Sequence, residues 1–64
     1  MKAKYTARIY LEVNEILKRE GDEMEELYTW MLVQAEGKFG SVRGEITDNK
    51  SKQVVKQFRK TPSD

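Results

Sequence analysis

Apolar and polar residues alternate strictly from residue 4 to residue 13, the pattern of a strand with one buried face. The polar side includes Arg8, Tyr10 and Glu12. The apolar side consists of Tyr5, Ala7, Ile9, Leu11 and Val13. We therefore expect an N-terminal strand that packs its apolar side into the core.

The alternation stops in residues 14–21, where the pattern is harder to interpret. Ile16 and Leu17 fit either a short helical turn or a second strand that folds back through Lys18 and Arg19. The residue types favour an extended segment, continued or bent. A turn or a short helix remains an alternative for this stretch.

A helix is predicted over residues 22–36. Asp22 suits the N-cap, Glu25 can complete a capping box, and Gly37 suits the left-handed position after the last turn. At about 100° per residue, one broad apolar face forms. It consists of Met24, Leu27, Tyr28, Met31, Leu32 and Ala35.

The last third predicts a β-hairpin. Val42, Gly44 and Ile46 alternate before the turn residues 48–51, and a second alternating run follows through Phe58. A three-residue loop over 49–51 would oppose Ile46 with Val54 and Val42 with Phe58, so that one face is apolar. A two-residue loop would mix apolar and polar residues on that face. We therefore expect the longer loop, with Asn49 or Lys50 left-handed.

These elements give an α+β fold of order β-α-β-β, in which one helix packs on a three-stranded, largely antiparallel sheet. The 64 residues suffice for one small core and are too few for two. We expect a single domain over residues 1–61, followed by a disordered tail at residues 62–64.

The absence of cysteine and histidine narrows the chemistry. Catalytic Ser–His and Cys–His pairs are excluded, and the commonest metal ligands are missing. A chain this short also has little room for a water-excluding pocket. We therefore expect no enzymatic activity, cofactor, metal or small-molecule substrate.

The apolar-looking run at residues 28–33 is far too short to cross a bilayer of about 30 Å. Charged residues near the N-terminus interrupt any apolar segment that a signal peptide would need. These features predict a cytoplasmic protein without a membrane partner.

Charge is distributed unevenly despite a net charge of +1. Residues 12–36 carry eight acidic and two basic groups, whereas residues 37–64 carry seven basic and three acidic groups. Such polarity can steer a partner, but the small net charge argues against strong non-specific binding of nucleic acid.

Two residues fall outside the apolar face of the helix. Trp30 lies off its edge and Val33 nearly opposite its centre, with Glu26 beside them. Tryptophan is enriched in binding hot spots, so these residues predict a protein interface. The first hypothesis is therefore a protein-interaction or regulatory module that forms a homodimer or binds another protein, either through Trp30 and Val33 or through an open edge of the sheet. Alternatively, Trp30 covers the rim of the domain and Val33 is a lone exposed apolar residue.

The outer face of the sheet is the second candidate. Arg8, Tyr10, Arg43 and Arg59 would project there, with Lys4 and Lys60 near its rim. Basic groups interleaved with an aromatic ring can hold phosphates and stack a base, which predicts nucleic-acid binding. A solvated face balanced by acidic neighbours is the alternative, because stacking platforms usually offer two or more aromatic rings.

Overall fold

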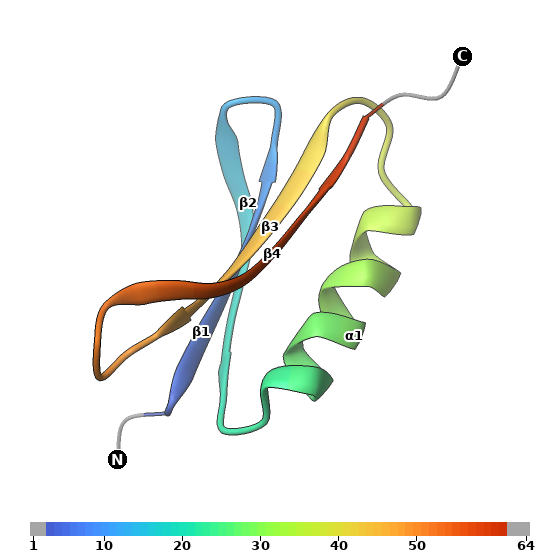
Figure 1. Cartoon of the computed structure of the whole chain (residues 1–64). Coiled ribbons are helices and arrows are strands. Elements are labelled where there is room, and N and C mark those ends of the chain that lie inside the picture. Colours follow the sequence, from blue (N-terminus) through green and yellow to red (C-terminus); the bar gives the residue numbers. More distant parts are fainter. Residues whose placement is uncertain (1–2, 62–64) are drawn as a thin grey trace.

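The computed structural model describes residues 3–61, which form four strands and one helix (Figure 1). In chain order they are β1 (Tyr5–Leu11), β2 (Asn14–Gly21), α1 (Met24–Glu36), β3 (Val42–Asp48) and β4 (Gln53–Lys60). The expected α+β architecture is confirmed, but the sheet has four strands where three were predicted. The predicted tail at residues 62–64 lies outside the described residues.

The strands form one open sheet in the order β2-β1-β3-β4, and every neighbouring pair is antiparallel. β1 and β3 lie in the centre, so that β2 and β4 are the two edges. α1 crosses one face of this sheet (Figure 1). No described element covers the opposite face, which we call the outer face.

The core lies between α1 and the two central strands. Its fully buried residues come from β1, α1 and β3, which are the alternating and helical positions that the sequence predicts. They are Ala7, Ile9, Leu27, Met31, Ala35, Val42 and Ile46. β4 adds Phe58, whose ring meets the Tyr28 ring edge-on with 6.1 Å between ring centres.

Two helix residues depart from the predicted face. Trp30, expected outside it, is half-buried and packs against the core, whereas Leu32, expected inside it, is 39% exposed. α1 is thus rotated about its axis relative to the predicted orientation, with Trp30 turned toward the sheet and Leu32 toward solvent. β2 accounts for this rotation, because it extends the sheet on one side of α1 and gives side chains on that side a surface against which to pack.

Residues 14–21 form the edge strand β2, in agreement with the extended alternative and with the hairpin through Lys18 and Arg19. A bulge at Ile16 interrupts the pairing with β1, because Ile9 faces Leu17 and Tyr10 faces Glu15. The extra residue breaks the two-residue period. Sequence alternation therefore could not reveal this strand.

The β1–β2 turn consists of Glu12 and Val13, and Glu12 adopts a left-handed φ of 58°. Its backbone N–H donates to the Ser41 carbonyl oxygen at 2.8 Å, which holds the turn against the start of β3. A non-glycine residue here is strained. We expect Glu12→Gly to raise the free energy of unfolding by about 0.5–1 kcal/mol, net of the entropy of the unfolded chain.

Urea denaturation followed by circular dichroism measures this effect. Val13→Gly is the matched control, because Val13 is also exposed to solvent but has no positive φ. It should lower the free energy of unfolding. Equal effects of the two glycines would show that Glu12 is not strained.

Both predicted helix caps need correction. The N-cap is Glu23 and makes no side-chain capping bond, while Asp22 Oδ1 accepts a hydrogen bond from the Lys4 N–H at 3.0 Å. Asp22 therefore ties the start of the helix to the start of β1. Gly37 has φ −89° and is not left-handed. The left-handed glycine is Gly40, at φ 92°, in the loop before β3.

The β3–β4 hairpin also differs from the expected register. Asp48 pairs with Gln53 across a four-residue turn, and Gly44, rather than Val42, faces Phe58. The Phe58 ring fills the space that the missing side chain of Gly44 leaves open. A bulge between Ile46 and Thr47 shifts the register within the hairpin, so that Asp48 can face Gln53 at the turn while Gly44 faces Phe58.

Asn49 is not the left-handed residue of this turn; Lys52 is, at φ 65°. The Asn49 side chain instead binds β1 and the residues before it. Its Oδ1 accepts from the Thr6 hydroxyl at 2.9 Å, and its Nδ2 donates to the Ala3 carbonyl at 3.0 Å. The turn is thereby attached to the N-terminal end of the sheet, and the buried Thr6 hydroxyl is satisfied.

Candidate interaction surfaces

Trp30 lies on the side of α1 that faces β2. The guanidinium carbon of Arg19 is 5.6 Å from the centre of its ring, so the two side chains form a cation–π contact. Glu26 is exposed beside it, and Val33 is 60% exposed on the surface away from the sheet. The structure thus brings Trp30 to the β2 edge and leaves Val33 apart from it.

β2 presents an unpaired edge with a mixed charge pattern. Its register with β1 places Glu15 and Lys18 on the outer face, opposite Tyr10 and Arg8. Glu15 Oε1 lies 3.4 Å from Arg8 Nε. Sequence reasoning missed Glu15 and Lys18 as surface candidates because it did not count residues 14–21 as a strand of the sheet, and the bulge at Ile16, which places both side chains on one face, leaves no alternation to signal them.

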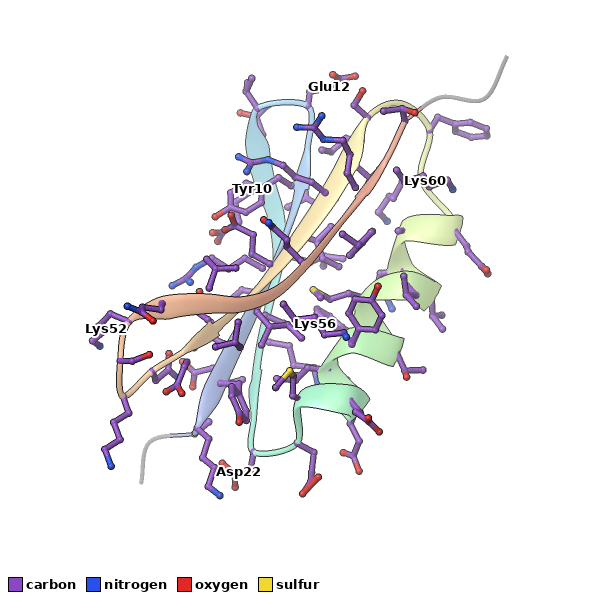
Figure 2. The ribbon with its side chains drawn as sticks, viewed as in Figure 1. Tyr10, Glu12, Asp22, Lys52, Lys56 and Lys60 are labelled. Carbon is purple, nitrogen blue, oxygen red and sulfur yellow. The ribbon has the colours of Figure 1, made fainter. Side chains whose placement is uncertain are left out.

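β4 is the second open edge, and its charge is of one sign. Residues 49–61 contain five lysines and arginines and no acidic residue. Two of these cations have structural contacts with α1: Lys56 Nζ lies 4.5 Å from the centre of the Tyr28 ring, and Lys60 Nζ donates to the Ala35 carbonyl at 3.1 Å. Figure 2 shows both on the helix side of β4. Lys60 therefore does not border the outer face as predicted.

The outer face carries the four predicted residues Arg8, Tyr10, Arg43 and Arg59. Three form a row across the sheet, because Tyr10 pairs with Arg43 on β3 and Arg43 pairs with Arg59 on β4. Arg8 lies two residues before Tyr10 on β1 and forms an ion pair with Glu15. The sequence predicted that these four residues share one face of the sheet. The structure shows in addition that three of them lie in a row.

Within residues 3–61, no group of three or more acidic side chains is arranged to hold a metal ion. Two hollows lined by Arg43 and Arg59 are partly open to solvent. α1, the helix in this part of the chain, is not long and apolar enough to cross a membrane.

No protein-family model, curated protein or solved structure matches this chain.

Proposed function

We propose that this chain is a non-enzymatic protein-interaction module that pairs with a second copy of itself through the β2 edge. An edge strand offers a row of free backbone N–H and C=O groups to another strand. β2 offers eight residues for such pairing, of which six are exposed and two, Leu17 and Gly21, are partly buried. The charge pattern of this edge is the observation that carries the proposal.

Two antiparallel β2 strands fit best around a two-fold axis between Ile16 and Leu17. In this register Glu15 of each copy lies opposite Lys18 of the other, and all four side chains belong to the outer face. Asn14 lies opposite Arg19 of the second copy on the helix face. Two pairs of opposite charges therefore form, and the residues of each of these pairs project from the same face of the joined sheet.

Other self-pairings are less favourable. A shift of β2 by two residues places Glu15 opposite Glu20, and like charges directly opposite destabilise a sheet. Self-pairing of β4 would bring together two strands that carry only positive charges. β2 is thus the edge whose sequence favours a second copy.

Trp30 borders this proposed contact. It packs over Arg19, which would lie opposite Asn14 of the second copy, so self-association changes the solvent around its ring. Trp30 is also the single tryptophan of the chain. Its fluorescence emission should therefore depend on protein concentration and report directly on the β2 edge. Val33 lies outside this contact and remains an untested prediction.

Charge reversal tests the register. Glu15→Lys or Lys18→Glu alone should weaken dimerisation about tenfold or more, because each change sets like charges opposite twice. The double variant should restore it, since the pairs reform with reversed sign. Within the chain, the carboxylate introduced by Lys18→Glu would also lie opposite Arg8. Sedimentation velocity over a range of concentrations measures the dimer dissociation constants of the two single variants and the double variant, for comparison with the parent chain.

Lys50→Glu is the matched control, because it makes the same charge change at an exposed position of the β3–β4 turn, and the hollow that Lys50 lines contains no β2 residue. It should leave the dimer intact. Thermal melts of each variant separate lost pairing from lost folding. A chain that sediments as a monomer at every concentration would refute the proposal, as would a double variant no better than the single ones.

A further inference from the structure

A row of three side chains crosses the outer face at the end of the sheet near Glu12. Tyr10 on β1, Arg43 on β3 and Arg59 on β4 occupy directly opposed positions. The guanidinium carbon of Arg43 lies 4.4 Å from the centre of the Tyr10 ring, which is a cation–π contact. Figure 2 shows Tyr10 on the side of the sheet away from α1.

The pairing of two arginines is unfavourable by itself. Like charges directly opposite on neighbouring strands destabilise a sheet. Arg43 Nη1 has a partial counter-charge in Glu45 Oε2 at 3.7 Å, too long for a strong hydrogen bond. Within residues 3–61, no carboxylate lies within ion-pairing distance of Arg59. The row thus holds excess positive charge that an anion would neutralise.

The surroundings of the row suit an extended anion. Two hollows of about 250 and 320 Å3 both include Arg43 and Arg59 in their walls. Ser41, Thr61 and Gln57 add neutral hydrogen-bonding groups. Glu12 lines the first hollow and Glu45 the second, so that each hollow holds two arginines and one carboxylate.

We propose that Tyr10, Arg43 and Arg59 bind the phosphodiester backbone of single-stranded nucleic acid. Guanidinium groups match the oxygens of phosphate in a two-pronged geometry. The Tyr10 ring offers an aromatic surface on which an unpaired base can stack beside Arg43, which an acidic peptide would not use. Two arginines are few for a duplex, whose binders usually neutralise many phosphates.

Fluorescence anisotropy with a labelled single-stranded oligothymidylate tests the site. Two phosphate contacts predict a salt slope of about −1.4, so a fourfold rise in salt should lower affinity about sevenfold. Arg43→Gln and Arg59→Gln should each weaken binding several-fold and reduce the slope by about 0.7. Lys52→Gln removes the same charge at the β3–β4 turn and should leave both quantities nearly unchanged.

A thermal melt distinguishes a binding role for Arg59 from a structural one. Removing one of two opposed cations should raise the melting temperature of Arg59→Gln while its affinity for the oligonucleotide falls. A structural role would instead lower the melting temperature.

Three results would overturn the proposal: no binding at low salt, an equal loss in Lys52→Gln, or equally tight binding of polyglutamate, which would indicate an acidic protein partner. The sedimentation coefficient of Arg59→Gln should match that of the parent chain. Failure of this site and failure of the β2 contact are therefore distinguishable.

Discussion

A Met31→Ala variant should lose most of its free energy of unfolding and be partly unfolded at room temperature. Met31 is fully buried between α1 and the sheet, and its sulfur fills the space above Gly44 together with the Phe58 ring. Truncating a buried methionine typically costs about 2–5 kcal/mol, through lost apolar contact and the cavity that remains. A domain of this size has a total stability of only about 3–5 kcal/mol. One substitution therefore removes most of it.

Leu32→Ala is the matched control, because the neighbouring Leu32 is 39% exposed. Its truncation should cost less than about 1 kcal/mol, since much of the side chain already contacts water. Urea denaturation monitored by circular dichroism measures both variants. The apolar face inferred from the sequence treats the two residues as equivalent. Equal destabilisation would therefore support that face and contradict the observed rotation of α1.

The sequence predicted the core well because periodicity reports on one-sided burial. Ala7 and Ile9 follow the two-residue period of β1, and Leu27, Met31 and Ala35 follow the helical period of α1. Periodicity does not specify how far a helix is rotated over its sheet. That angle depends on which strands flank the helix, and the prediction lacked β2. For this reason it misplaced Trp30 and Leu32.

Residues 14–21 were predicted to be extended but were not counted as a strand of the sheet, for two local reasons. The Glu12–Val13 turn lacks the glycine or asparagine that marks a tight hairpin, since Glu12 itself takes the left-handed conformation. The bulge at Ile16 then reverses the alternation within the strand. A turn without its usual residues followed by a broken period leaves no pattern from which to infer a strand.

The outer-face residues were predictable as a set, but their contacts were not. Strand alternation places Tyr10, Arg43 and Arg59 on one face in either hairpin register. The expected three-residue loop would have paired Arg43 with Gln57, whereas the four-residue turn pairs it with Arg59. The opposed arginines, from which the nucleic-acid proposal follows, thus depend on a two-residue difference in register.

Gly44→Ala should lower the free energy of unfolding by about 1–3 kcal/mol, the usual cost of overpacking a core. A Cβ at this position would overlap the Phe58 ring and lie 2.9 Å from Met31 Sδ. The ring cannot move outward without losing its edge-on contact with Tyr28. Glycine is therefore required here by the close approach of two side chains, and not by its backbone conformation.

Gly37→Ala separates this effect from glycine removal in general. The atom nearest to a Cβ on Gly37 is the Gln34 carbonyl oxygen at 3.9 Å, and its φ of −89° suits alanine. This control should be neutral or stabilise the fold by up to about 1 kcal/mol.

A second experiment combines Gly44→Ala with Phe58→Leu. If the ring causes the clash, the double variant should be more stable than the sum of the two single effects predicts, because the smaller side chain makes room for the new methyl group.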